Sequence, residues 1–176
     1  MEHRVYYAVT FNEEETKALI KLRSEFIKAC SEGKPIPKNS MHMTLAFLGN
    51  VGDEDLSLLR LIRESISFEP FTFQLSKLGY FPDQKDSRLY YLTSSQDEAL
   101  YALQKALTDA LKKHQVAFHD RQFLPHLTLS RKTILKEEPQ LSLPLTLTVS
   151  SFHLLESIPY ENTRIGINID KTKDLD

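Results

Sequence analysis

Two short segments of the chain contain the same pattern, His-x-Thr-Leu. The first begins at His42 and the second begins at His126, 84 residues later. Each segment carries an imidazole, which exchanges protons near neutral pH, and a hydroxyl two residues further on. Side chains alternate across a β-strand, so a histidine and a threonine at i and i+2 face the same side. Each segment therefore predicts a strand that presents an imidazole beside a hydroxyl.

Two such pairs suit a displacement at phosphorus. One imidazole removes a proton from the attacking group while the other donates a proton to the leaving oxygen, and each transfer contributes roughly 10²–10⁴ in rate. The hydroxyls of Thr44 and Thr128 can donate hydrogen bonds to the non-bridging phosphate oxygens. A 2′,3′-cyclic phosphate, with one negative charge and a strained leaving group, needs no metal in this scheme. One copy of the pattern usually has no function, but two copies in apolar strands form a more specific signal.

Other reactive residues carry weaker predictions. His119 and Asp120 precede His126, but their spacing matches no standard metal site and no cysteine completes a ligand set, so we expect no metal and no cofactor. Cys30 is the only cysteine and cannot form an internal disulfide, which is typical of proteins in a reducing cytosol. The remaining histidines are expected to be surface or satisfied residues: His3, His114 and His153.

The elements that position these groups mix helices and strands without regular alternation, which favours an α+β fold. Apolar periodicity predicts strands at 5–11, 42–49, 71–78, 88–93, 126–131, 143–157 and 163–169. It predicts helices at 13–30, 54–66 and 97–114, the first two capped by Asn12 and Asp53. Glycine and proline predict loops at 32–40 and 79–87. The two histidine segments occupy corresponding places, each after a helix and a loop, so two related halves are expected.

Strict alternation also predicts which side chains of the histidine strands are buried. Met43, Leu45 and Phe47 are expected to enter a core on the face opposite His42. The same rule places Arg131 opposite the second histidine. This arginine can then reach a bound phosphate only if its strand ends or bulges before it.

Length and charge narrow the class of protein. The chain has 176 residues and a net charge of −2, which suits one domain with a substantial core. Because the sequence contains no block of Lys and Arg, we expect RNA to be bound at a short end rather than along its backbone. The N-terminus does not resemble a signal peptide, and no apolar run is long enough to span a membrane. We expect a cytoplasmic protein, and a monomer.

The residues around both histidines resemble a known family. "MHMTLAFLG" at 41–49 and "PHLTLSR" at 125–131 are similar to the two signature motifs of the two-histidine phosphoesterases. The likeness is strongest to the RNA 2′,3′-cyclic phosphodiesterases, also called 2′-5′ RNA ligases. It extends to Phe123 and to the segments 78–82 and 88–92. Near the C-terminus Ser157 is kept, but the family's following Gly-Tyr spacing is not, which bears on the substrate end of the site.

The resemblance implies a single bilobal phosphoesterase domain over 1–176, with two pseudo-symmetric lobes, each an antiparallel sheet with helices, around a central cleft. It implies metal-independent hydrolysis of 2′,3′-cyclic phosphates at RNA 3′ ends to 2′-phosphates. His42 would be the proton donor and His126 the proton acceptor, although sequence leaves the reverse assignment open. Thr44, Thr128 and Arg131 would bind the phosphate.

Two further points stay open at the level of sequence. Phe123 or Tyr80 could stack on the terminal base, or could belong to the core. The site could instead open another cyclic phosphate, such as that of ADP-ribose, or act on 2′-5′ linkages, including their ligation. In a different class, the protein could bind RNA ends or nucleotides without catalysis, although a binder has no need of two proton-transfer groups.

Overall fold

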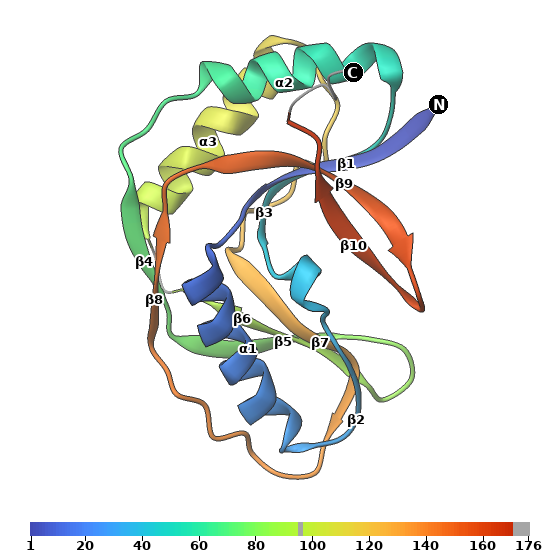
Figure 1. Ribbon diagram of the computed structural model, residues 1–176, viewed down its shortest axis with the longest axis vertical. Coiled ribbons are helices and arrows are strands. Elements are labelled where there is room, and N and C mark those ends of the chain that lie inside the picture. The colour runs from blue at the N-terminus through green and yellow to red at the C-terminus, as the bar shows by residue number, and fades with distance from the viewer. Residues whose placement is uncertain (95–96, 171–176) are drawn as a thin grey trace.

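The computed structural model, which describes residues 1–94 and 97–170, consists of two lobes joined along one side (Figure 1). The upper lobe contains an antiparallel sheet whose strands, in spatial order, are β10 (Thr163–Asn168), β9 (Phe152–Tyr160), β1 (Glu2–Val9) and β3 (Met43–Gly52). The lower lobe contains a second antiparallel sheet, ordered β2 (Cys30–Pro35), β7 (His126–Leu135), β6 (Arg88–Thr93) and β5 (Lys77–Pro82). A ribbon of β4 (Phe71–Leu75) and β8 (Leu145–Val149) runs between the lobes. The α+β class and the two-lobed architecture are confirmed.

Within residues 1–94 and 97–170, three α-helices cover the sheets: α1 (Glu13–Ile27), α2 (Leu56–Ser65) and α3 (Glu98–Lys113). The cap predicted for α1 is confirmed, because Asn12 accepts from the backbone N–H of Glu15 and the Glu15 carboxylate accepts from that of Asn12. Asp97 caps α3 by accepting from the N–H of Leu100. Such caps satisfy N–H groups that have no partner within the helix.

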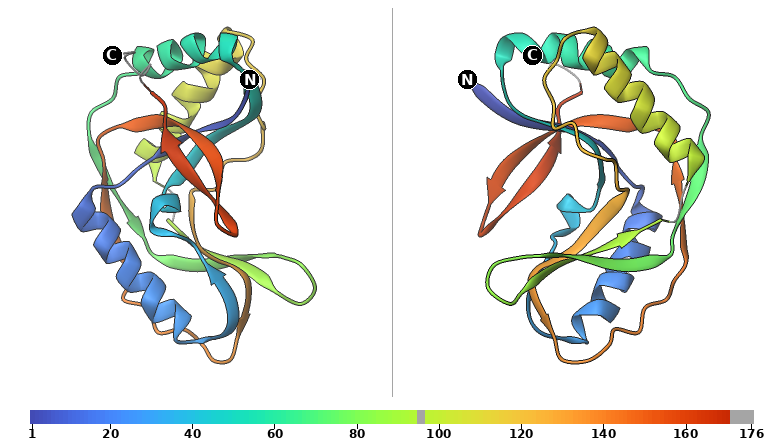
Figure 2. Two further views of the ribbon diagram at one scale, coloured as in Figure 1. Left: turned by 45° about the vertical axis from the view of Figure 1, so that its right-hand side comes forward. Right: turned by 180° about the vertical axis from the view of Figure 1, so that it is seen from behind.

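The two halves of the chain exchange helices between lobes. Helix α1 follows an upper strand, β1, but packs on the lower sheet, where the ring of Phe26 lies 5.2 Å from that of Tyr90. Helix α3 follows a lower strand, β6, but packs on the upper sheet, where Gln104 donates to the carbonyl of Leu45. In each half the histidine strand pairs antiparallel with the strand that precedes the helix. The predicted correspondence of the halves thus appears as a reciprocal exchange (Figure 2).

Several predicted elements differ in the structure. The predicted loops 32–40 and 79–87 contain strands β2 and β5, and the predicted strands 71–78 and 143–157 are each divided in two. Both β2 and β5 are edge strands that are largely exposed on both faces, so their sequences lack the alternation that marks a half-buried strand. Asp53 does not cap α2. It begins a 3₁₀ turn, η2 (Asp53–Asp55), and its carboxylate pairs with the N-terminal amine and His3.

One apolar core connects the lobes, since its buried residues come from all three helices and from both four-stranded sheets. A small cluster of Tyr6, Ala8 and Leu155, with Phe47 against it, lies apart from this core and packs together side chains of β1, β9 and β3. Tyr6 and Phe47 of this cluster line the cleft described below. In the part of the chain that the structure describes, no helix has the length and apolar character needed to cross a membrane.

Candidate active site

The first motif begins at His42, the residue just before β3, and continues into this strand, whose pairing with β1 is interrupted by a bulge. Ala8 pairs with Thr44 and Tyr7 with Ala46, so Leu45 is an extra residue without an opposite partner. Leu45 and Ala46 are consecutive yet both buried. A bulge shifts the alternation by one residue. Phe47 therefore faces the same side as Thr44, and the prediction that it enters the core is wrong.

The second motif repeats this geometry on β7. Tyr91 pairs with Thr128 and Tyr90 with Ser130, which leaves Leu129 without an opposite partner. Leu129 and Ser130 are both buried, and Arg131 is exposed on the side of Thr128. The bulge that alternation required for Arg131 to reach the cleft is thus present.

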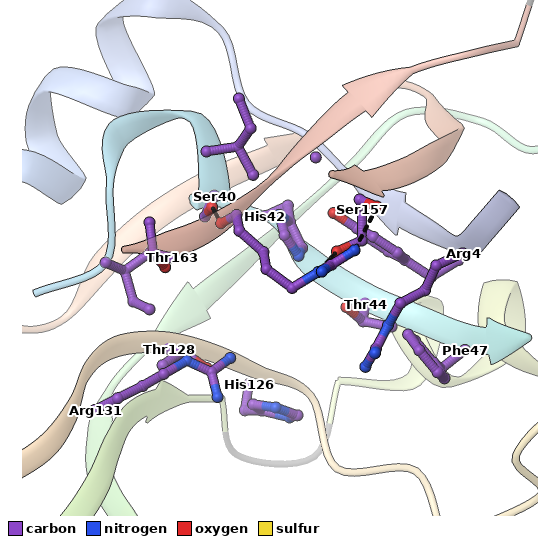
Figure 3. Close-up of a pocket in the computed structure, with 15 residues that line it drawn as sticks. Arg4, Ser40, His42, Thr44, Phe47, His126, Thr128, Arg131, Ser157 and Thr163 are labelled. Atoms are coloured by element: carbon purple, nitrogen blue, oxygen red, sulfur yellow. Dashed lines mark hydrogen bonds between the residues drawn. The ribbon is translucent and has the colours of Figure 1, made fainter. Parts of the chain in front are cut away.

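The two motifs face each other across one cleft between the lobes (Figure 3). The cleft has a volume of about 440 Å³, within the range of small-molecule sites. Its walls contain both predicted histidines, both threonines and Arg131, together with residues of β1, β9, β10 and the segment before β3. The lining residues are Arg4, Tyr6, Ile36, Ser40, His42, Thr44, Phe47, His126, Thr128, Arg131, Ser157, Thr163, Arg164, Ile165 and Gly166.

His42 is held by packing. Its ring lies 4.9 Å from the ring of Tyr6, which projects from the neighbouring strand β1. Burial, with smaller contributions from His126 and Arg131, lowers the pKa of His42 from 6.5 to about 4. This imidazole is therefore neutral at pH 7, and an anion placed beside it would raise its pKa.

His126 is held by a hydrogen bond. Its Nδ1 lies 2.9 Å from the carbonyl oxygen of Leu124, which can only accept, so Nδ1 carries the proton of the neutral ring. Nε2 then has a free lone pair, the form required of a general base. The buried hydroxyl of Thr93 donates to the carbonyl of Pro125 at 2.5 Å and fixes the residue just before the histidine. Phe81 and Tyr91 place ring edges against the imidazole, at 5.8 and 5.5 Å between centroids.

The far wall of the cleft is formed by β9 and β10. Ser157, which sequence associated with the substrate end, lines this wall and accepts a hydrogen bond from Nε of Arg164 at 2.8 Å. A Cβ added at Gly166 would lie 2.2 Å from the Tyr6 hydroxyl oxygen, so glycine lets Tyr6 pack under this wall. Sequence reasoning did not identify Arg4, Tyr6, Arg164 or Gly166. The alternation of Arg4 and Tyr6 along the first strand could have indicated that they share a face.

The two candidates for base stacking lie elsewhere. The ring of Phe123 packs against Tyr101, 5.3 Å away, and against the core. Tyr80 is exposed under the guanidinium of Arg88, 3.8 Å from its ring. Neither residue lines the cleft. On β5 alternation turns the next residue, Phe81, toward His126 instead.

Three of the other histidines have structural partners. His119 packs its ring on Phe47, 4.9 Å away, and its backbone N–H donates to the carbonyl of that residue. His3 lies between carboxylates of Asp53 and Glu156, and His153 pairs with Asp170. Over residues 1–94 and 97–170, no three His, Cys, Asp or Glu side chains are grouped as metal ligands would be.

Comparison with known protein families shows which family this chain belongs to. A model of the 2′-5′ RNA ligase superfamily matches residues 27–159, which include both motifs. The chain belongs to this superfamily. It is therefore a relative of the two-histidine phosphoesterases, as its motifs suggested.

Individual relatives of the superfamily agree with this placement. An RNA 2′,3′-cyclic phosphodiesterase of Thermus thermophilus is 30% identical over 136 residues, covering 73% of this chain and 68% of the relative. A protein of the same name from Thermotoga maritima is 28% identical over 130 residues, covering 73% and 69%.

Solved structures of other proteins share the fold. The crystal structure of E. coli LigT in apo form superposes with a TM-score of 0.78 at 25% identity, over 96% of this chain and 95% of LigT. The phosphodiesterase domain of MHV ns2 has a TM-score of 0.62 at 11% identity, covering 89% of this chain and 99% of that domain, and so shares the fold alone.

Proposed function

We propose that the protein hydrolyses 2′,3′-cyclic phosphates at RNA 3′ ends and leaves 2′-phosphates, without a metal ion. The observation that carries the proposal is the placement of two His-Thr pairs, one from each lobe, on opposite sides of one cleft. The names of the relatives in Thermus and Thermotoga support the same substrate class.

The proposed reaction assigns one proton to each histidine. Nε2 of His126 takes a proton from water as the water oxygen bonds to phosphorus, and the bond from phosphorus to O3′ breaks. His42 gives a proton to O3′, so the phosphate stays on O2′. The free Nε2 of His126 supports its role as base. Burial lowers the pKa of His42, whereas the negative charge of a bound cyclic phosphate raises it. Substrate binding therefore favours the protonated imidazole that the general acid requires.

The remaining polar groups stabilise charge on the phosphate. The hydroxyls of Thr44 and Thr128 donate to the non-bridging oxygens, and Arg131 supplies a charge-assisted hydrogen bond. Because the proton transfers and the charge stabilisation come from side chains, the chemistry does not call on a Lewis acid.

Turnover in a chelator tests the proposal. The protein, with EDTA, is incubated with a 2′,3′-cyclic mononucleotide and with an oligonucleotide bearing a cyclic end, and products are followed by phosphorus NMR. Accumulation of 2′-phosphomonoesters is expected, and a protein with both His42 and His126 replaced by alanine serves as the control. Loss of turnover in EDTA with recovery on adding a divalent ion would refute the metal-independent mechanism. Binding without turnover in any buffer would instead identify a non-catalytic binder.

A further inference from the structure

The cleft contains more positive charge than one cyclic phosphate requires. Arg131 lies on the lower lobe near His126, where it can serve the reacting phosphate, but Arg4 and Arg164 also line the cleft from the upper lobe. No carboxylate is among the lining residues in the part of the chain that the structure describes. Within those same ranges, none of the three guanidinium groups forms an ion pair. A chain with a net charge of −2 thus places at one site three arginines without ion pairs among the described residues.

The two upper arginines are positioned differently, and only Arg164 contacts Ser157 directly. Nε and Nη2 of Arg164 donate to the hydroxyl and the carbonyl of Ser157, at 2.8 and 2.9 Å. Strand β1 pairs with β9 through Val5 and Glu156, so the next position along the register sets Arg4 beside Ser157. The guanidinium of Arg4 is steadied by the ring of Phe47, 5.2 Å from its centroid. Figure 3 shows Arg4 and Arg131 entering the cleft from different sides of the two imidazoles.

These contacts leave donors available for a ligand. A guanidinium has five N–H groups, and Arg164 uses only Nε and one N–H of Nη2 on Ser157. Ser157 is neutral, so it orients Arg164 without cancelling its charge. A planar guanidinium with free donors and no carboxylate partner is suited to phosphate oxygens.

We propose that Arg4 and Arg164 form a second phosphate subsite, which binds the phosphate on the 5′ side of the terminal nucleotide. The inference rests on the proposed function, because it takes the reacting phosphate to lie between the histidines. In an RNA with a cyclic end, the nearest other negative charge is that 5′ phosphate, one ribose away. The subsite would make the enzyme selective for oligonucleotide ends over cyclic mononucleotides.

Three substrates measure the contribution of the second phosphate: a 2′,3′-cyclic mononucleotide, the same nucleotide with a 5′-phosphate, and a dinucleotide with a cyclic end. We expect kcat/KM for the second and third to exceed the first by roughly 10- to 100-fold, as for charge-assisted hydrogen bonds. Arg4→Gln and Arg164→Gln should each lower this ratio, and Arg164→Lys should retain part of it. Arg88→Gln, which removes an arginine outside the cleft, should leave the ratio unchanged. Circular dichroism establishes that each variant is folded.

The outcomes separate this inference from the function on which it rests. An equal gain with the 5′-phosphate and with the dinucleotide would assign the subsite to phosphate charge, as proposed. A gain with the dinucleotide alone would overturn it, because contacts to the second nucleoside would then account for the preference. Calorimetry with a nucleoside 2′-monophosphate and the matching 2′,5′-bisphosphate tests the subsite without turnover. Equal affinity for the two, or a preference that survives the double Arg4→Gln and Arg164→Gln variant, would overturn it. Absence of turnover with all three substrates would refute the proposed function instead.

Discussion

Phe47 and Arg131 occupy equivalent positions in the two lobes, each five residues after its motif histidine and each turned toward the cleft by a β-bulge at the motif leucine. The bulges add a third cleft-facing position to each His-x-Thr pair. One lobe uses it for an aromatic ring and the other for a cation. The site is therefore symmetric in its backbone and asymmetric in its chemistry.

Replacing Arg131 with glutamine should raise the pKa of His42. The positive charge of Arg131 is one of the causes that lower this pKa, so its removal favours the protonated imidazole. The value should remain below 6.5, because burial is the larger cause. Proton NMR titration of the His42 ring measures the change, and Arg131→Lys, which keeps the charge, should leave the pKa low. An unchanged pKa in Arg131→Gln would show that the arginine does not act on His42.

Removing either histidine should abolish most turnover on a cyclic phosphate. His42→Ala and His126→Ala should each lower kcat by roughly 10²–10⁴, the usual range for a positioned proton-transfer group. The double variant should lose less than the product of the two, because the groups act in one displacement. Steady-state kinetics on a cyclic-ended oligonucleotide provides the measurement. A folded single variant with near wild-type kcat would eliminate that histidine from the mechanism.

The free energy of unfolding should decrease on acidification, and part of this decrease should depend on His42. The pKa of this residue is about 4 in the folded protein and returns to the ordinary value of 6.5 on unfolding, so the unfolded chain binds more protons between these values. The free energy of unfolding should therefore decrease as pH falls from about 7 to 4.5, with about 2 kcal/mol attributable to this residue. Urea unfolding of the wild type and His42→Gln at both pH values measures the difference.

Comparing the wild type with His42→Gln removes the contributions of other titrating groups, because both proteins contain them. The pKa of His3 is raised by hydrogen bonds to Asp53 and then Glu156, so His3 contributes stability at low pH in both proteins. If His42→Gln loses as much stability on acidification as the wild type, the buried imidazole does not titrate as described.

Gly166→Ala should disturb the cleft through Tyr6. The new Cβ would lie 2.2 Å from the Tyr6 hydroxyl oxygen, whereas Cζ of Tyr6 and Cδ1 of Leu155 would be 3.3 and 3.4 Å away. Overpacking of this kind costs roughly 1–3 kcal/mol. Tyr6→Phe removes the oxygen, so the double variant should recover most of the lost stability in urea unfolding. A double variant as unstable as Gly166→Ala would place the strain in the backbone rather than in the hydroxyl.

The paired motifs were predictable because alternation within a strand fixes where His and Thr point. The same rule failed for Phe47, and it left Arg131 undecided, since a bulge depends on how two strands pair and leaves no local mark in either sequence. In both strands, alternation predicts the correct face as far as the motif leucine, and the opposite face for the residues directly after it.

For a related reason, the sequence does not predict that Phe81 faces the motif histidine. Gly79 and Pro82 predict a loop, in which alternation has no meaning, whereas the segment is an edge strand that turns Phe81 toward His126. The sequence does not link Arg4 to Arg164, which are 160 positions apart. The order of strands β1, β9 and β10 brings both side chains to the same cleft.

The exchange of α1 and α3 between lobes also bears on how such a molecule can be altered. Neither lobe is a continuous stretch of chain, since the polypeptide leaves each sheet to supply a helix to the other and then returns. One half of the sequence, on its own, would form a sheet without the helix that packs on it. Its own helix would have no sheet to pack against. Gene duplication could therefore create this architecture only if both copies associated from the start, each completing the other.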